Sequence, residues 1–267
     1  MQRKTNPEDN MEKKLIIVPD VHGRTFWKQV KEYKNTPIVF LGDYLDPYTS
    51  LEGITSEEAI ENFKEILRFA RENRENVTLL YGNHDSYAFK SSEMCSCRHD
   101  WNNIDTIEKL FDDNEDLFKM AYDCNIEDKH FLLTHAGVNP IWIQSNFDLF
   151  GDKFNYSANE LNSIDKKTFT SALCDVSRYR GGYQYVGSMV WSDIQEYDTT
   201  KELSKRFQIE ISDKIKFPKN LIQICGHTWC EIPISIYCED YSIICIDVQK
   251  IFYIDENAKL GYLLKNE

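Results

Sequence analysis

The decisive stretch of this sequence is Leu15-Ile16-Ile17-Val18-Pro19-Asp20-Val21-His22-Gly23, an apolar run that ends in a turn carrying an aspartate and a histidine. The same pattern returns in Pro37–Asp46 and in Val77–Asp85. Each apolar run has the length and composition of a buried strand. Helical patterns separate the runs, at Phe26–Tyr33 and after a capping box that begins at Thr55. This alternation predicts a mostly parallel sheet with helices packed on it.

Two later strand-like runs carry the same kind of turn. Phe131–Thr134 is followed by His135-Ala136-Gly137, and Leu221–Cys225 is followed by Gly226-His227-Thr228. A single turn of this kind usually has only a capping role. Five such turns, each at the end of an apolar run, instead indicate one site, because the carboxyl ends of strands in an α/β sheet meet at a common edge.

The five turns, in this order, resemble the motifs of the calcineurin-like metallophosphoesterases, and within them the phosphoprotein-phosphatase branch, with its bacterial serine/threonine phosphatases and diadenosine tetraphosphatases. The resemblance implies an α/β fold of the metallophosphatase type, a four-layer sandwich of two mixed β-sheets flanked by helices. We expect a single catalytic domain over residues 14–267, after a disordered tail at residues 1–13. The polar segment at about residues 140–188 is predicted to be an insertion over the site.

The resemblance also implies a ligand set for two metal ions. Asp20 and His22, from the motif D-x-H-G, correspond to ligands of the first ion. Asp43, from G-D-x-x-D, corresponds to the carboxylate that bridges both ions. The ligands of the second ion correspond to Asn83, His135 and His227.

The chemistry of these ligands narrows the choice of metal. Carboxylate oxygen, amide oxygen and imidazole nitrogen suit manganese, iron or zinc, whereas a site this rich in imidazole is less suited to magnesium alone. We therefore expect two divalent ions, with manganese as the first choice and iron or zinc as alternatives. Many relatives carry a second histidine in the last motif, but this chain has Thr228 and Trp229 there, as the phosphoprotein-phosphatase branch does.

A catalytic pair follows from the same resemblance. His84 corresponds to the general acid that protonates the leaving oxygen, and Asp46 corresponds to the carboxylate that orients it. A carboxylate on one ring nitrogen holds the tautomer and favours the protonated imidazole. His99 and His130 match no motif, and we expect them to be solvent-facing or capping residues.

The arginines that usually bind the substrate phosphate are missing from their expected places. Pro47-Tyr48 stands where the branch usually has Arg-Gly, and Tyr81 precedes Gly82 in place of another arginine. A dianionic phosphate favours the planar, bidentate guanidinium. The candidates to compensate are Arg24, Arg178 and Arg180. The string Trp191-Ser192-Asp193 resembles a family motif that we expect to support the site.

Composition excludes several partners. The formal net charge of −13 and the pI of about 5.0 argue against binding to nucleic acids or anionic membranes. No stretch approaches the ~20 apolar residues that cross a bilayer, and the N-terminus lacks an apolar signal region. The eight cysteines are therefore expected to be reduced thiols of a cytoplasmic protein. A zinc knuckle at Cys95–Cys97 is a weaker alternative.

Further elements are expected from local pattern alone. These are a helix over Ile107–Tyr122, a helix near Lys166–Arg178, a strand end at Val190–Ser192, and an antiparallel meander over Ile234–Leu264 that forms a second sheet.

Three functions agree with these observations. The first is a two-metal hydrolase of phosphate monoesters, acting on a phosphorylated small molecule or on phosphoserine and phosphothreonine in proteins. The second is a hydrolase of dinucleoside polyphosphates or other nucleotides, which the loss of Arg-Gly favours. The third is a catalytically silent metal-binding scaffold, against which the intact His84 and Asp46 argue. The sequence leaves the physiological substrate and the oligomeric state open.

Overall fold

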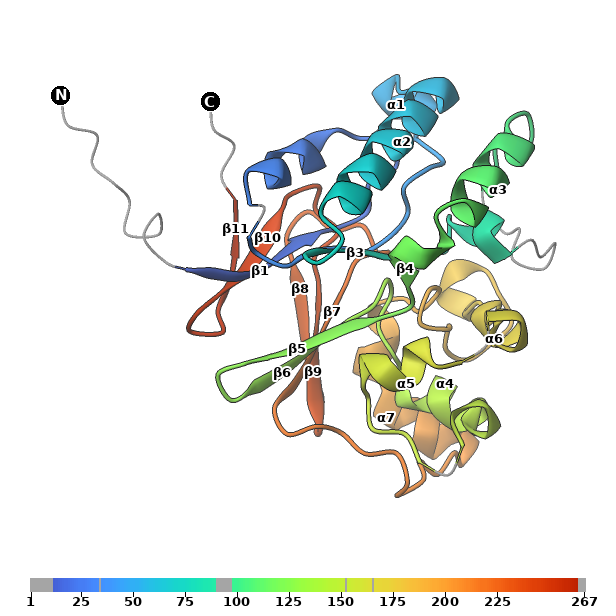
Figure 1. Ribbon diagram of the computed structural model, residues 1–267. Coiled ribbons are helices and arrows are strands. Elements are labelled where there is room, and N and C mark those ends of the chain that lie inside the picture. Colours follow the sequence, from blue (N-terminus) through green and yellow to red (C-terminus); the bar gives the residue numbers. More distant parts are fainter. Residues whose placement is uncertain (1–11, 34, 90–97, 152, 165, 264–267) are drawn as a thin grey trace.

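The computed structural model describes residues 12–33, 35–89, 98–151, 153–164 and 166–263. The Cys95–Cys97 loop and residues 1–11 of the predicted tail lie outside these residues. Two mixed β-sheets and the helices that flank them make up the described fold, as expected (Figure 1).

The first sheet has the strand order β11-β10-β1-β2-β3-β4. The four strands from β1 to β4 are parallel to one another. Strand β10 pairs with β1 in antiparallel fashion, and β11 pairs with β10 in the same way. The strands are β1 (Lys13–Val18), β2 (Ile38–Phe40), β3 (Val77–Leu80), β4 (Phe118–Lys119), β10 (Phe252–Asp255) and β11 (Leu260–Tyr262).

The second sheet has the order β5-β6-β7-β9-β8. Its central strands β6, β7 and β9 are parallel, whereas β5 and β8 are antiparallel to their neighbours. The strands are β5 (Tyr122–Ile126), β6 (Lys129–Leu133), β7 (Leu221–Cys225), β8 (Ile234–Tyr237) and β9 (Tyr241–Cys245).

Strand β1 shows why its apolar run is continuous. Leu15 and Ile17 pack in the core between the two sheets, with Leu133 and Ile224 of the second sheet. The alternate residues of β1 face the core that the helices cover. A strand buried on both faces needs apolar residues at every position, because neither face meets water.

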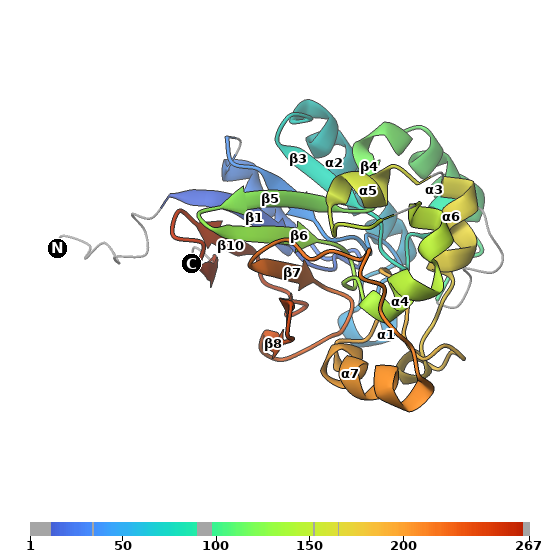
Figure 2. The same ribbon diagram turned by 90° about the horizontal axis from the view of Figure 1, so that it is seen from below.

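The helices form the outer layers. Helix α2 (Ser56–Glu72) begins with the predicted capping box, in which Thr55 accepts from the Glu58 amide and the Glu58 carboxylate accepts from the Thr55 amide. In both views α4 to α7 gather beside one end of the sheets (Figures 1 and 2). The remaining helices are η2 (Phe26–Glu32), α1 (Thr49–Glu52), η3 (Ser86–Phe89), α3 (Ile104–Asp112), η5 (Glu115–Leu117), α4 (Pro140–Ser145), η6 (Phe147–Phe150), α5 (Ala158–Asn162), α6 (Lys166–Leu173), η7 (Arg178–Arg180) and α7 (Gln195–Phe207).

Several local predictions were wrong. The helix expected over Ile107–Tyr122 ends at Asp112, and η5, β4 and the start of β5 occupy the remainder. Residues Val190–Ser192 lie in a turn, not at a strand end. The helix expected near Lys166–Arg178 is confirmed in part, because α6 begins at Lys166 but ends at Leu173, and η7 begins at Arg178.

The C-terminal strands also do not form a sheet of their own. Strands β8 and β9 extend the sheet that contains β7, whereas β10 and β11 cross to the sheet that contains β1. Local turn signals indicate that strands are present, but the partner of each strand depends on distant residues.

Two other properties follow from the described residues. No helix among them is both long enough and apolar enough to span a bilayer. The six cysteines that lie within them are free thiols, as predicted.

Candidate metal centre

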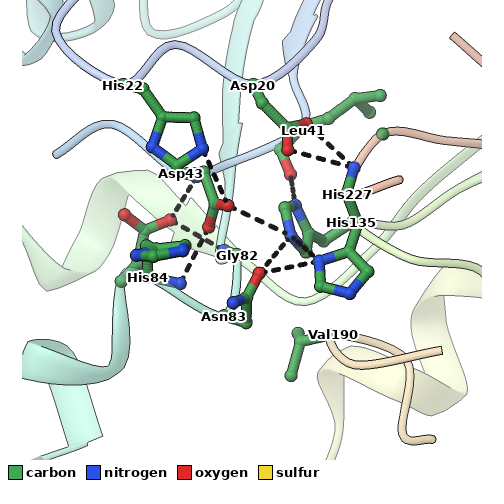
Figure 3. Close-up of polar contacts among 12 residues, drawn as sticks. Asp20, His22, Leu41, Asp43, Gly82, Asn83, His84, His135, Val190 and His227 are labelled. Atoms are coloured by element: carbon green, nitrogen blue, oxygen red, sulfur yellow. Dashed lines mark hydrogen bonds and ion pairs between the residues drawn. The ribbon is translucent and has the colours of Figure 1, made fainter. Parts of the chain in front are cut away.

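The side chains predicted as metal ligands lie together where strands of both sheets end (Figure 3). Asp20, Asp43 and Asn83 follow β1, β2 and β3 of the first sheet. His135 and His227 follow β6 and β7 of the second sheet. The site therefore depends on the packing of one sheet against the other.

Asp43 is at the middle of this group. Its Oδ1 accepts a hydrogen bond from the backbone amide of His84 at 2.8 Å. Its Oδ2 lies 3.4 Å from Nε2 of His22 and 3.5 Å from Nε2 of His135. One carboxylate oxygen thus faces imidazoles from two sides, which is the arrangement expected of a bridging ligand.

Backbone carbonyls determine the tautomers of both imidazoles. Nδ1 of His22 lies 2.9 Å from the carbonyl oxygen of Leu45, and Nδ1 of His135 lies 2.8 Å from that of Leu41. A carbonyl oxygen only accepts, so Nδ1 carries the hydrogen in each neutral ring and Nε2 carries a lone pair. Both lone pairs point toward the carboxylate of Asp43, so a cation is the partner that fits between them.

A second convergence involves Asn83. Its Oδ1 lies 2.8 Å from Nε2 of His135 and 2.8 Å from Nδ1 of His227, and these two nitrogens are 3.2 Å apart. Because Nε2 of His135 has no hydrogen, it cannot donate to the amide oxygen. The amide oxygen and the Nε2 lone pair therefore face each other without a hydrogen between them, as two ligands of one metal ion do. Asp43, His135 and His227 form one potential metal-binding group, and His22, Asp43 and His84 form another.

Asp20 lies beside these groups, and its role as a metal ligand stays a prediction. It belongs to neither of these two groups, and both of its carboxylate oxygens lie within hydrogen-bond distance of the His227 amide, at 3.0 and 3.1 Å. Burial, and then the neighbouring carboxylate of Asp247, raise the pKa of Asp20 well above its usual range. Asp20 thus ties the end of β1 to the turn after β7. No sequence motif pointed to Asp247.

Four residues of the centre have left-handed backbone conformations. The φ angles are +45° at His22, +53° at Asp43, +55° at Asp46 and +64° at His227. Such angles are uncommon for residues with a Cβ and are retained where surrounding structure enforces them. They aim each side chain across the end of its strand.

Two motif glycines make room for the buried carboxylates. A Cβ on Gly82 would lie 2.2 Å from Oδ1 of Asp43, and a Cβ on Gly226 would lie 2.0 Å from Oδ1 of Asp20. No side chain fits at such a distance. The glycine of G-N-H-D and that of G-H-T are therefore required by the carboxylate beside each.

Asp85, the last residue of G-N-H-D, is a further structural residue of the centre. Its carboxylate accepts from the amides of Gly82 at 2.7 Å, Asp43 at 2.8 Å and Tyr44 at 3.1 Å. These bonds join the turns after β2 and β3. Burial nevertheless raises the pKa of Asp85 to about 6. The motif contained this signal, because an aspartate after a tight turn often accepts from nearby amides.

His84 and Asp46 lie in contact, and their catalytic roles stay a prediction. Nδ1 of His84 lies 2.9 Å from Oδ2 of Asp46, and the hydroxyl of Tyr87 donates to the other oxygen of Asp46 at 2.7 Å. Burial raises the pKa of Asp46 to about 7, and burial lowers the pKa of His84. Tyr87 is a buried anchor of the pair that the sequence motifs did not single out.

Of the three predicted arginines, Arg180 reaches the centre. Its Nη2 donates to Oγ1 of Thr228 at 2.7 Å and to the carbonyl oxygen of His227 at 3.3 Å. Its Nε lies 2.9 Å from the carboxylate of Asp193, so the W-S-D segment holds this guanidinium.

The other two predicted arginines have different partners. Arg24 binds the carboxylate of Glu52 through two nitrogens, with the shortest contact at 2.8 Å. Arg178 is exposed and lies over the ring of Tyr185, 5.0 Å from its centroid. Their roles in phosphate binding stay predictions.

The segment that begins at Arg98 packs beside His84 and Asp46. Oγ of Ser86 lies 2.6 Å from Nε2 of His99, and the amide of Asp100 donates to the hydroxyl of Tyr87 at 2.6 Å. His99 is partly buried, so the expectation that it faces solvent or caps an element was wrong. Arg98, beside it, was also missed, because nothing in the local sequence relates it to the distant motifs.

The fold and the site define a class of protein, the α/β proteins with a two-sheet core and a potential metal centre at the ends of the strands. The model of the calcineurin-like phosphoesterase family matches residues 13–228, and the chain belongs to this family. It is therefore a metal-dependent phosphoesterase, and its family uses a centre of two divalent ions. No curated protein matches the chain significantly.

Solved structures that resemble this chain include two phosphatases and a phosphoesterase. The cold-active protein-tyrosine phosphatase of a psychrophilic Shewanella species has 15% identity and a TM-score of 0.49, over 95% of this chain and 81% of that one. A protein serine/threonine phosphatase from Saccharomyces cerevisiae, similar to human PP5, has 12% identity and a TM-score of 0.49, over 97% and 82%. The phosphoesterase YfcE from E. coli has 12% identity and a TM-score of 0.36, over 93% and 97%.

Substitution Gly82→Ala should disturb the centre through Asp43. The added Cβ overlaps Oδ1 of Asp43, so we expect a loss of about 1–3 kcal/mol of stability and weaker metal binding. Gly53→Ala is the matched control, because Gly53 has a φ of +73° but no atom within 4 Å of an added Cβ. The control should cost only the backbone strain of about 1–2 kcal/mol. Urea unfolding and metal content measure both; normal metal content in Gly82→Ala would contradict this account.

Proposed function

We propose that this phosphoesterase is a two-metal phosphatase that hydrolyses phosphate monoesters. The observation that carries the proposal is the carboxylate of Asp43, which faces His22 on one side and His135 on the other, next to a hydrogen-bonded His84–Asp46 pair. The family membership makes the reaction class firm, and the proposal concerns the substrate.

The residues present fit a pair of divalent ions. His22 and Asp20 would hold the first ion, Asp43 both, and Asn83, His135 and His227 the second. Such ions supply a hydroxide nucleophile at neutral pH and neutralise charge on the phosphoryl group. Manganese is the proposed metal, because the ligands combine oxygen and imidazole nitrogen.

His84 is the proposed donor of the proton to the leaving oxygen. Its Nδ1 is held by Asp46, so its other ring nitrogen is the one that can serve substrate. Tyr87 holds the second oxygen of Asp46, which leaves the carboxylate a single orientation toward His84. An alkoxide leaving group needs this proton, because it is a strong base.

Arg180 is the proposed phosphate-binding residue, and it lies on the side of the centre where His227 stands. Asp193 fixes the guanidinium, and the contact with Thr228 places it next to the His227 turn. Arg178 and Arg24 are the remaining candidates, and their contacts with Tyr185 and Glu52 make them weaker ones.

A substrate panel tests the proposal. The purified chain, loaded with manganese, should hydrolyse an aryl phosphate monoester and a phosphoserine or phosphothreonine peptide faster than a diester or a dinucleoside polyphosphate. The reverse order would favour the nucleotide hydrolase, and metal binding without turnover would favour the scaffold. The free thiols of the described residues support the proposed cytoplasmic location.

Asp43→Asn should remove most of the bound metal. The amide lacks the charge needed to bridge two cations, so the loss should exceed the ~10- to 100-fold in metal affinity that removing an outer-shell partner costs. Metal content by mass spectrometry and turnover of an aryl phosphate measure this. Asp105→Asn, at an exposed position of α3, is the control. Two bound ions and full turnover in Asp43→Asn would refute a bridging role.

The loss of kcat in His84→Ala should depend on the basicity of the leaving group. An alkyl phosphate should lose about 10²- to 10⁴-fold in kcat, the usual contribution of a general acid, and nitrophenyl phosphate much less. His130→Ala is the control, since His130 bonds Asn125 outside the centre. Equal losses on both substrates would instead indicate a positioning role for His84.

Arg180→Ala should lower kcat/KM by about 10- to 100-fold, as expected for a lost charge-assisted hydrogen bond. Arg180→Lys should recover part of this loss, because an ammonium cannot make the planar bidentate contact. Metal content should stay at the unsubstituted value in both variants. Full activity of Arg180→Ala would move attention to Arg24 and Arg178.

A further inference from the structure

One cation beside the catalytic pair has no role in the function proposed above. Nη2 of Arg98 donates to the carbonyl oxygen of Asp46 at 3.0 Å, and the carboxylate of the same Asp46 binds His84. Arg98 is exposed, so its guanidinium also meets solvent. Within the described residues, no carboxylate lies at ion-pair distance from it.

The position of this guanidinium is well defined. It lies over the ring of Tyr48, with its central carbon 3.8 Å from the ring centroid. The Tyr48 ring in turn meets the ring of His22 edge-on, with 5.2 Å between centroids. The hydrogen bonds of the next two residues, His99 to Ser86 and Asp100 to Tyr87, hold the backbone in place.

The neighbouring arginines differ from Arg98 in their charge balance. Arg24 is paired with Glu52, and Arg180 is paired with Asp193. A guanidinium that is held in place, and that has no carboxylate partner among the described residues, is suited to bind an anion.

We propose that Arg98 binds an anionic group on the leaving side of the scissile phosphate. This inference rests on the proposed function, because the position of His84 identifies the leaving side. In the reaction, water attacks phosphorus, the P–O bond to the leaving group breaks, and the leaving oxygen departs with its electron pair and takes the proton of His84. A leaving group that carries a second phosphate or a carboxylate presents its own oxygens to the guanidinium, which binds either group bidentately.

Three substrates test this preference. The leaving group of phenyl phosphate carries no additional anionic group. The leaving group of 3-carboxyphenyl phosphate carries one carboxylate on the same ring. The leaving group of inorganic pyrophosphate is itself a phosphate. Arg98→Ala should lower kcat/KM about 10- to 100-fold on one or both of the charged substrates, the value of a charge-assisted hydrogen bond. On phenyl phosphate it should change kcat/KM less than about threefold. The substrate that loses more tells whether the natural group is a carboxylate or a phosphate.

Matched variants separate this effect from a general disturbance. Arg206→Ala removes an arginine that lies over the ring of Phe207 on α7, and it should leave all three rates unchanged. Arg98→Gln keeps most of the side-chain bulk and should behave as Arg98→Ala does. Tyr48→Leu should shift the same substrates in the same direction, because it removes the ring that supports the guanidinium. Thermal unfolding and metal content verify that each variant is folded and loaded.

The outcomes distinguish the two proposals. Equal losses on all three substrates would place Arg98 on the transferred phosphoryl group and overturn the inference, as would unchanged rates on all three. The unsubstituted protein alone tests the proposed function, through its turnover of phenyl phosphate. A folded, metal-loaded protein that does not hydrolyse phenyl phosphate would refute the monoesterase, and the rate on pyrophosphate would then still test Arg98.

Discussion

The structure depends on the burial of several carboxylates at the meeting point of two sheets. Asp20, Asp43, Asp46, Asp85 and Asp247 are all at least nine-tenths shielded from solvent. Burial is the first cause that raises the pKa of each one. Charged groups in such a place must be compensated, because an uncompensated buried charge costs several kcal/mol. The loops around the centre bring hydrogen-bond donors and imidazoles to these carboxylates.

Different carboxylates are compensated in different ways. Asp85 accepts three backbone amides, so it needs no cation and serves to join two turns. Asp46 accepts from His84 and Tyr87. Asp43 accepts a hydrogen bond from one backbone amide and otherwise faces imidazole lone pairs, so cations are its natural partners. The packing of Tyr44 helps to hold the strained turn at Asp43, since its ring stacks on Phe63 and its hydroxyl donates to Leu80.

Sequence predicted the parts of the site that local patterns encode. Each predicted ligand stands at the end of an apolar run, and strand ends meet by the geometry of the sheet. The pairing of the C-terminal strands was mispredicted, because a turn pattern shows where a strand ends but not which strand it pairs with. Strand β10 joins β1 across more than two hundred residues of sequence. Arg98 was missed for a similar reason, since only the folded chain brings it to Asp46. The helix predicted past Asp112 failed because short apolar runs suit either strand or helix.

The cations proposed for the centre would allow an acidic chain to bind an anionic substrate. The net charge of −13 opposes phosphate over the molecule as a whole, and solvent screens that field within about 8–10 Å at physiological ionic strength. Binding is therefore decided locally. Arg180 stands on the side of His227, and Arg98 stands on the side of His84. In the functions proposed above, cations bound at Asp43 would stand between them, and the anion would then meet positive charge from the transferred phosphoryl group to the leaving group. The order of these charges, more than their sum, is then what selects among phosphate esters.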